Sequence, residues 1–144
     1  FARRELEMAV PHALLPADHR LAGQSMVSLR DLAGEPIILS DEGLSIRHML
    51  RLFKQTGVIP HVAHRVRALE VMRSLAGAGE GIGISYTVPS GGRSYDGYPV
   101  RALPITDPAA REAVLLAAPG GIPDSGALIA DFFTHRPETR QGNR

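Results

Sequence analysis

The sequence contains no cysteine, which excludes a disulfide framework and any metal site built on thiolates. A chain without cysteine suits the reducing cytoplasm, where we expect this protein, although the periplasm would also accommodate it. The formal net charge is only +1, with 22% charged residues. The chain therefore carries no basic field that would bind nucleic acid by bulk electrostatics.

Membrane and export signals are also missing from the sequence. No apolar run approaches the ~18 residues that a membrane-spanning helix needs. The segment 1–16 contains acidic residues and lacks the uninterrupted apolar core of a signal peptide. The chain begins with Phe1 instead of Met, so we expect it to start in mid-sequence. Its 144 residues, 44% of them apolar, are enough for one domain with a sizeable core.

What the sequence does contain is organised around Leu69–Pro89 (LEVMRSLAGAGEGIGISYTVP). Its first apolar residues share one helical face, and a run of glycines then ends the helix because glycine adopts positive φ at little cost. A buried strand is expected to follow. Apolar residues at i, i+3, i+4 and i+7 predict a second helix at Ile46–Thr56, capped by Ser45 and ended by Gly57.

Further strands and turns follow from the same patterns. The expected elements are apolar strands at Pro36–Leu39, His61–Val66 and Ile82–Tyr86; strands at Tyr98–Ile105 and Glu112–Ala118; a strand at Leu6–Leu15 interrupted by Pro11; a short turn at Val27–Leu32; and a last helix capped by Asp124 or Ser125. The central order β-α-β-α-β implies a parallel sheet with right-handed crossovers. We expect the last helix to bury Leu128, Ile129, Phe132 and Phe133, and residues 137–144 to form a disordered tail.

The glycine run does not have the spacing of a dinucleotide-binding loop. That fingerprint, G-x-G-x-x-G, opens a helix after a strand. Starting from Gly77, Gly79 or Gly81, the final position falls on a residue other than glycine. The run also follows a helix instead of opening one, so we interpret it as a structural helix stop.

No catalytic or metal constellation emerges from the other polar residues. The six histidines do not converge: His61 and His64 lie on opposite faces of one strand, and no H-E-x-x-H occurs. No G-x-S-x-G elbow is present. The adjacent carboxylates Asp41 and Glu42 are more typical of a solvated loop than of an acid/base pair. We therefore expect no enzymatic activity, no metal and no cofactor.

Three polar segments fall at one edge of the predicted sheet. Ser40–Arg47 follows one parallel strand and opens a helix, Arg67 lies where the second strand meets its helix, and Ser85–Thr87 ends the third strand. Open α/β sheets bind ligands at this edge, and the free N–H groups of a helix start favour an anion. Helix capping, a surface arginine and an interfacial tyrosine remain the alternatives to a small-molecule cleft.

Four stretches together resemble the effector-binding region of LysR-type transcriptional regulators. They are LLPADHRLAG (Leu14–Gly23), VSLRDLAGEPIIL (Val27–Leu39), RHMLRLFKQTGVIP (Arg47–Pro60) and VRALEVMRSLAGAGEGIGI (Val66–Ile84). Near the end of the sequence, an apolar strand followed by a helix with paired phenylalanines also agrees with this resemblance. The resemblance runs from Leu6 to Phe133, and it lies in the order and spacing of the stretches more than in any single motif.

This resemblance implies an α/β fold of the periplasmic-binding-protein-like type 2. Residues 1–136 would be a partial, N-terminally truncated effector-binding domain, with Ala13–Asp107 as the second lobe and residues 1–12 and 108–136 as remnants of the first. The family binds a small effector between the lobes, assembles as dimers or tetramers, and contacts DNA through an N-terminal helix-turn-helix. That helix-turn-helix is absent from this sequence.

The resemblance also implies which residues contact the effector, a small and polar or anionic molecule. They are Ser40, Asp41, Gly43, Leu44, Ser45, Arg67, Ala68, Ser85, Tyr86 and Thr87. Some members have an acidic residue after the arginine, where this chain has Ala68, so no particular effector carries over. The peroxide-sensing branch of the family is unsupported because the chain has no cysteine.

Two other functions remain in consideration. A solute-binding protein of a transport system would share the lobed architecture but should follow a secretion signal, so the sequence upstream of Phe1 discriminates the two. An enzyme on the same sheet would need a catalytic constellation, which the sequence lacks.

For the partial first lobe, we expect exposed apolar strand edges and faces that favour dimerisation or aggregation.

Overall fold

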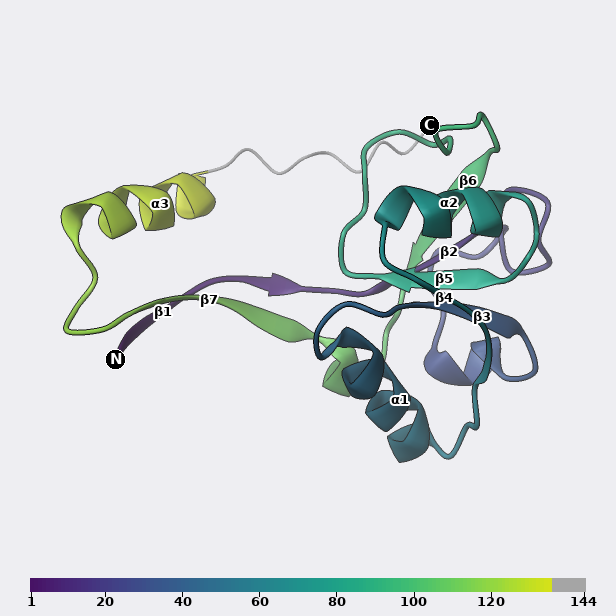
Figure 1. Cartoon of the computed structure of the whole chain (residues 1–144), viewed down its shortest axis with the longest axis horizontal. Helices are drawn as coiled ribbons and strands as arrows, with labels where there is room; N and C mark the ends of the chain where they lie inside the picture. Colours follow the sequence, from purple (N-terminus) through teal and green to yellow (C-terminus); the bar gives the residue numbers. More distant parts are fainter. Residues whose placement is uncertain (136–144) are drawn as a thin grey trace. The chain divides into compact units, whose positions relative to one another are not determined.

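The computed structural model describes residues 1–135 and divides into two compact units. Unit 2 is Val10–Ala110, and unit 1 combines Phe1–Ala9 with the chain from Arg111 onward. The chain therefore begins in unit 1, builds all of unit 2, and returns to unit 1 (Figure 1). Each unit has its own sheet, so each is described by itself.

Unit 2 is built on a five-stranded sheet with the order β4-β3-β5-β2-β6. The strands are β2 (His12–Pro16), β3 (Pro36–Ser40), β4 (His61–Val66), β5 (Ile82–Ser85) and β6 (Val100–Pro104). Strand β3 pairs in parallel with β4 and with β5, whereas β2 is antiparallel to both β5 and β6. The predicted parallel β-α-β-α-β unit is thus confirmed, and the strand predicted at Tyr98–Ile105 is present in shorter form.

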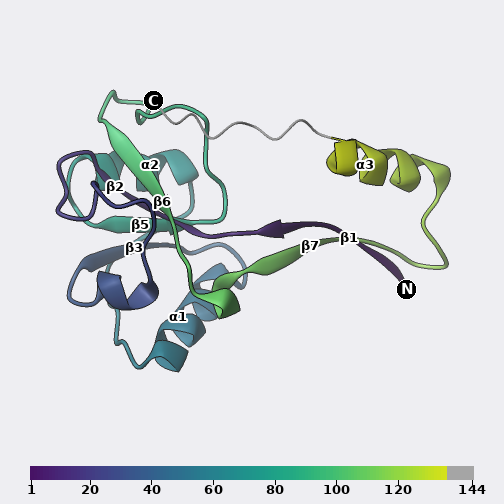
Figure 2. The ribbon, with the colours of Figure 1, turned by 180° about the vertical axis from the view of Figure 1, so that it is seen from behind.

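Helices cover both faces of this sheet. Helix α1 (Ser45–Thr56) and helix α2 (Leu69–Gly77) lie on opposite sides of it (Figures 1 and 2). In β3, Ile37 belongs to the core cluster under α1, while its neighbour Ile38 belongs to the cluster under α2. A strand buried on both faces needs apolar residues at successive positions, which is why β3 reads as an apolar run instead of an alternating one.

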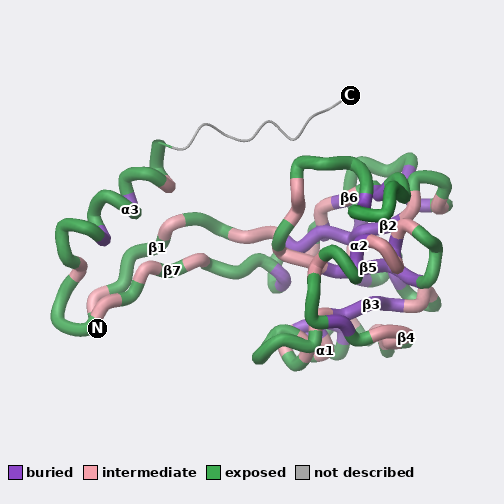
Figure 3. Tube along the Cα trace, turned by 45° about the horizontal axis from the view of Figure 1, so that its top comes forward, coloured by how far each residue is buried: buried purple, intermediate pink, exposed green. Residues whose placement is uncertain are grey.

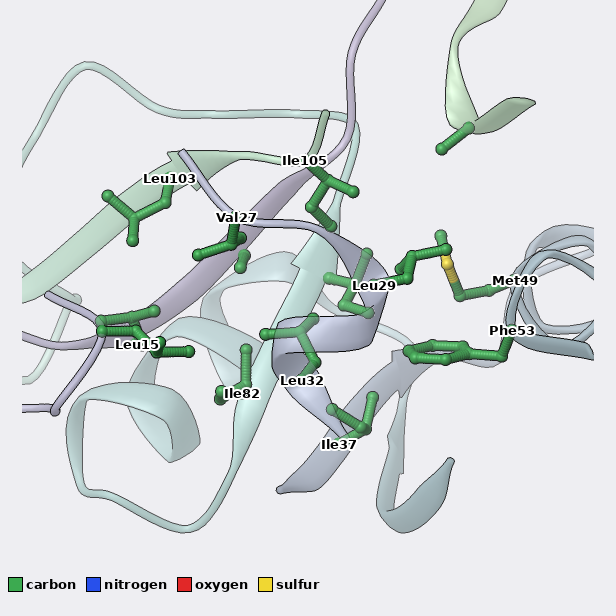
Figure 4. Packing of buried hydrophobic residues seen from close by; sticks show 14 of the residues in the cluster. Leu15, Val27, Leu29, Leu32, Ile37, Met49, Phe53, Ile82, Leu103 and Ile105 are labelled. Carbon is green, nitrogen blue, oxygen red and sulfur yellow. The ribbon is translucent and has the colours of Figure 1, made fainter. Parts of the chain in front are cut away.

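The core on the α1 side is the larger of the two. It includes two short 3-10 helices, η1 (Leu29–Leu32) and η2 (Pro108–Ala110). Phe53 is fully buried and points from α1 toward Leu32 and Ile37 (Figure 4). The buried stripe of α1 and its end at Gly57, with φ of 75°, confirm the sequence prediction.

The predicted cap of α1 is wrong. Ser45 is the first residue of the helix, Leu44 occupies the cap position, and no side chain within residues 1–135 makes a capping hydrogen bond there. The physical reason is the tight turn before the helix: Gly43 has φ of 56°, and the Ser45 amide donates to the Glu42 carbonyl at 3.1 Å. The chain enters α1 through this turn and not through an extended capping residue.

The glycine run ends α2 as predicted and also has a packing role. Gly79, with φ of 82°, takes the left-handed conformation just after the helix. Gly83 lies in β5, where a Cβ atom would stand 2.6 Å from Cγ of Met72 on α2. The absence of a side chain at Gly83 therefore lets α2 pack closely on the sheet.

Unit 1 is a two-stranded antiparallel sheet with one helix. Strand β1 (Ala2–Ala9) pairs with β7 (Glu112–Ala118), and helix α3 (Asp124–His135) packs against β1. The strand expected at Leu6–Leu15 is in fact two strands in two different sheets, because β1 ends at Ala9 and β2 begins at His12 on the other side of Pro11. The predicted tail at 137–144 lies outside the described residues.

The prediction for the buried side of α3 is wrong. Leu128 and Phe132 are 71% and 62% exposed, Ile129 is exposed too, and only Phe133 is half-buried. The buried residues of the helix are Gly126 and Ala130, and most of α3 is exposed (Figure 3). A Cβ atom at Gly126 would stand 2.7 Å from Cγ2 of Ile122, so the helix approaches its neighbours through its small residues. A two-stranded sheet has too little area to cover the large residues of the same helix as well.

Candidate functional site

A cavity of about 150 Å³ lies at the carboxyl ends of three strands in unit 2. The residues that line it come from the ends of β3, β4 and β5, the loop after β3 and the first turn of α2. They are Ser40, Glu42, Val66, Arg67, Ala68, Leu69, Met72, Ser85 and Thr87. Strands β3, β4 and β5 run in parallel, so their carboxyl ends meet at one edge, where open α/β sheets bind ligands.

The N-terminus of α2 forms one wall of this cavity. Ala68, in extended conformation, occupies the cap position, and among the described residues no side chain caps the helix. The first backbone N–H groups of a helix have no partner inside the helix. The positive end of the helix dipole therefore faces the cavity next to Ala68 and Leu69, which favours an anionic ligand group.

Arg67 adds a full positive charge beside this helix start. Its side chain is exposed, and within residues 1–135 it forms no hydrogen bond or ion pair. The guanidinium therefore keeps its hydrogen-bond donors available in a fork geometry that matches a carboxylate.

One carboxylate, that of Glu42, lies in the same lining. Ser40 and Glu42 line the cavity, whereas Asp41 between them does not and instead donates its backbone amide to the Val66 carbonyl at 2.8 Å. Both carboxylates were expected in a solvated loop, and the predicted effector contacts include Asp41 but not Glu42, whereas the cavity lining contains Glu42 and not Asp41. Glu42 lies in a bend after β3 and not in the strand, so no period-two pattern of the sequence separates the two carboxylates.

The segment after β5 also contributes to the cavity lining. Ser85 and Thr87 line the cavity and Tyr86 does not. Ser85 closes a small turn, because its Oγ accepts from the Thr87 amide at 3.0 Å and donates to the Thr87 carbonyl at 2.9 Å. The Tyr86 hydroxyl instead donates to the Ala110 carbonyl at 2.5 Å.

Half of the residues that the sequence predicted are thus brought together in the lining. They are Ser40, Arg67, Ala68, Ser85 and Thr87. The other predicted residues lie outside the lining that the described chain forms, and they are Asp41, Gly43, Leu44, Ser45 and Tyr86. Val66, Leu69 and Met72 also line the cavity without having been predicted. Leu69 and Met72 start the apolar stripe of α2, whose first turn reaches the cavity.

A buried arginine holds the long loop that continues from Thr87. Arg73 is 6% exposed, and its Nη2 donates to the carbonyls of Gly91 at 2.6 Å and Arg93 at 2.5 Å. Its Nη1 donates to Oε1 of Glu70 at 2.6 Å. The sequence patterns described above predict no role for Arg73. A charged residue next to the apolar stripe of a helix is the signal that could have found it.

The same loop is also fastened by a carboxylate. Asp96 accepts hydrogen bonds from the hydroxyls of Ser94 at 2.6 Å and Ser74 at 2.7 Å. These bonds favour the ionised form and lower the pKa of the Asp96 carboxyl. Helix α2 therefore presents its first turn to the cavity and holds the following loop through Arg73 and Ser74.

The described part of the chain holds no group of three His, Cys, Asp or Glu residues that could bind a metal ion. Among the same residues, no helix has both the length and the apolar character that crossing a membrane requires.

Comparison with known proteins assigns this architecture to a family. The family described as "LysR substrate binding domain" matches residues 3–131. HinK, a LysR family transcriptional regulator from Pseudomonas aeruginosa, has a similar structure, with a TM-score of 0.78, 32% identity and coverage of 91% of this chain and 46% of that one. The transcriptional dual regulator GltC of Bacillus subtilis (strain 168) is 36% identical over 72 residues, which are 49% of this chain and 24% of GltC.

A ligand complex is also among the similar structures. It is the BenM effector binding domain with its effector benzoate, with a TM-score of 0.64, 27% identity and coverage of 79% of this chain and 52% of that one. The chain spans about a quarter of the length of GltC and about half that of HinK. Its α/β fold is that of LysR effector-binding domains, which are periplasmic-binding-protein-like of type 2. The chain belongs to the LysR substrate binding domain family.

Proposed function

We propose that this chain is the effector-sensing part of a LysR-type transcriptional regulator. The observation that carries the proposal is the cavity at the carboxyl edge of the unit 2 sheet, lined by an uncapped helix start and by Arg67, in a chain of this family. Unit 2 then corresponds to the second lobe, and unit 1 to part of the first. The parent protein is a cytoplasmic oligomer that contacts DNA through a separate helix-turn-helix.

The chain acts in this proposal by binding and not by catalysis. Closure of the lobes around an effector shifts the parent between two arrangements, because the effector binds one of them better. The matched relatives GltC and HinK are transcriptional regulators, which supports this function over that of a transport protein or an enzyme. The loop residues Asp41, Gly43, Leu44 and Ser45 complete the effector contact only if the loop changes its conformation.

The cavity favours a small carboxylate as effector. Arg67 and the α2 N-terminus supply positive charge, and the hydroxyls of Ser40, Ser85 and Thr87 supply further hydrogen bonds. Glu42 in the same lining repels a second negative charge, so a monoanion suits the cavity better than a dianion. A cavity of about 150 Å³ is the size of one that accommodates benzene, and benzoate is the effector of the BenM domain.

The test is a titration of the 144-residue chain with benzoate and with benzamide, followed by calorimetry and by amide chemical shifts. Benzoate should shift the amides of Leu69, Ser85 and Thr87, and benzamide should bind at least tenfold more weakly because it lacks the charge. Arg67→Ala should weaken benzoate binding about tenfold to a hundredfold, the range for hydrogen bonds to charged groups.

Arg65→Ala is the matched control, because Arg65 is an exposed arginine of β4 outside the cavity lining. Equal losses of benzoate affinity in the two variants would show that general positive charge and not the cavity binds the anion. If neither benzoate nor a panel of other small monocarboxylates shifted the cavity amides, the proposed effector class would be wrong.

A further inference from the structure

Tyr86 has cavity-lining residues on both sides, yet its own side chain makes its hydrogen bonds elsewhere. Its hydroxyl donates to the Ala110 carbonyl at 2.5 Å and lies 3.0 Å from Nε2 of His48. The half-buried ring packs against the core on the α1 side of the sheet. Since Ser85 and Thr87 line the cavity, any displacement of this segment by a ligand also moves Tyr86.

Ala110 occupies a special place in the chain. It is fully buried and is the last residue of unit 2, so the chain passes to unit 1 at the next residue, Arg111. The segment before it is well anchored, because the Thr106 amide donates to the Val27 carbonyl at 2.8 Å and Asp107 accepts from the Leu29 amide at 2.7 Å. The Tyr86 hydroxyl adds an anchor at the peptide group that joins Ala110 to Arg111, which is the crossing itself.

His48 brings a second cavity-lining segment to the same hydroxyl. It lies in the first turn of α1, and its amide donates to the Leu44 carbonyl at 3.0 Å. The loop before this turn carries Glu42, which lines the cavity. A hydroxyl has one proton, and that of Tyr86 is donated to Ala110, so the Nε2 atom of His48 must carry the proton that it shares with Tyr86.

We propose that Tyr86 is a positioning residue that couples the cavity to the point where the chain leaves unit 2. Changes at Ser85–Thr87, and at the start of α1 through His48, alter the hydrogen bond between Tyr86 and Ala110 and thereby the restraint on the crossing peptide. That an effector in the cavity is what causes these changes rests on the proposed function. The coupling itself belongs to the chain without ligand, so it is tested without one.

The first experiment compares wild type with Tyr86→Phe by NMR of the 13C,15N-labelled chain. Loss of the hydroxyl should change the carbonyl 13C shift of Ala110 and accelerate amide exchange at residues 110–113 about fivefold, the factor for one lost hydrogen bond. Tyr95→Phe is the matched control, because Tyr95 is 93% exposed, and it should change neither. His48→Ala should give a smaller change of the Ala110 shift in the same direction, and it replaces Tyr86→Phe if that variant does not fold.

The second experiment separates coupling from simple support of the fold. Thr87→Gly loosens the cavity segment and should change the Ala110 signals when Tyr86 is present, but should add nothing in the Tyr86→Phe background. Additive effects of the two substitutions, or an unchanged Ala110 carbonyl in Tyr86→Phe, would overturn the proposal. Because no effector is used, this result stays distinct from a failure of the benzoate titration.

Discussion

The two units of this chain use similar apolar patterns with opposite outcomes. In unit 2, the apolar stripe of α1 is buried in a core to which the 3-10 helices and four strands of the sheet also contribute residues. In unit 1, the apolar residues of α3 stay largely exposed next to a two-stranded sheet. An apolar stripe indicates only that one face of a helix can be buried. Whether it is buried depends on how much surface the rest of the unit offers.

The largest difference in the free energy of unfolding is expected between two phenylalanine-to-alanine substitutions, one in each unit. Phe53→Ala in α1 should lower the free energy of unfolding by about 3–5 kcal/mol, because a fully buried aromatic side chain leaves a cavity. Phe132→Ala in α3, at a residue that is 62% exposed, should change it by about 0.5 kcal/mol or less. Urea denaturation followed by circular dichroism measures both, and similar losses would contradict the contrast between the units.

A smaller change in the free energy of unfolding is expected when a methyl group is added at a close contact between α2 and the sheet. Gly83→Ala would place Cβ 2.6 Å from Cγ of Met72 and should destabilise unit 2 by about 1–3 kcal/mol through overpacking. Gly23→Ala is the control, since no described atom lies within 4 Å of its added Cβ. Equal denaturation midpoints for these two variants would mean that α2 moves aside without cost.

Acid should weaken unit 2 through His12. Burial lowers the pKa of this imidazole below 6.5, partly offset by its hydrogen bond to the Val10 carbonyl. The unfolded state then binds more protons, so the free energy of unfolding decreases as pH falls below 6.5 and the effect is absent above it. Denaturation series from pH 7.5 to 5 should show a smaller decrease in His12→Gln than in wild type, and identical decreases would contradict this role.

The smallest change in stability, but a clear change in association, is expected on the exposed face of α3. Leu128→Ser should alter the free energy of unfolding by about 0.5 kcal/mol or less, because Leu128 is 71% exposed. It should nevertheless reduce self-association, since an exposed apolar patch promotes it. Sedimentation velocity at several concentrations tests this, and a wild-type chain that is monomeric throughout would contradict it.

Much of unit 2 could be predicted from the sequence because its signals are local. The end of α1 at Gly57, the end of α2 in the glycine run and the apolar strand at Pro36 each follow from a few adjacent residues. The start of α1 could not be predicted, since a turn at Gly43 replaced the expected serine cap. The role of Arg73 was missed for a related reason: its partners Gly91 and Arg93 lie on a distant loop.

The candidate site shows the same division. The sequence predicts that three parallel strands end at one edge of the sheet, and the cavity is lined from the ends of those three strands. The sequence does not distinguish Glu42 from Asp41 or show that Tyr86 lies outside the lining, because both depend on how the chain bends after β3 and after β5.

By itself, the sequence determined the order of elements, the parallel sheet of unit 2 and the family, because periodicity, glycine stops and the spacing of segments are carried along the chain. Only the tertiary structure decided which large apolar residues are buried, which polar side chains share the cavity, and that Tyr86 and His48 meet at Ala110. Those outcomes depend on how much surface the rest of each unit offers and on contacts between residues that are far apart in the sequence. No local pattern predicts them.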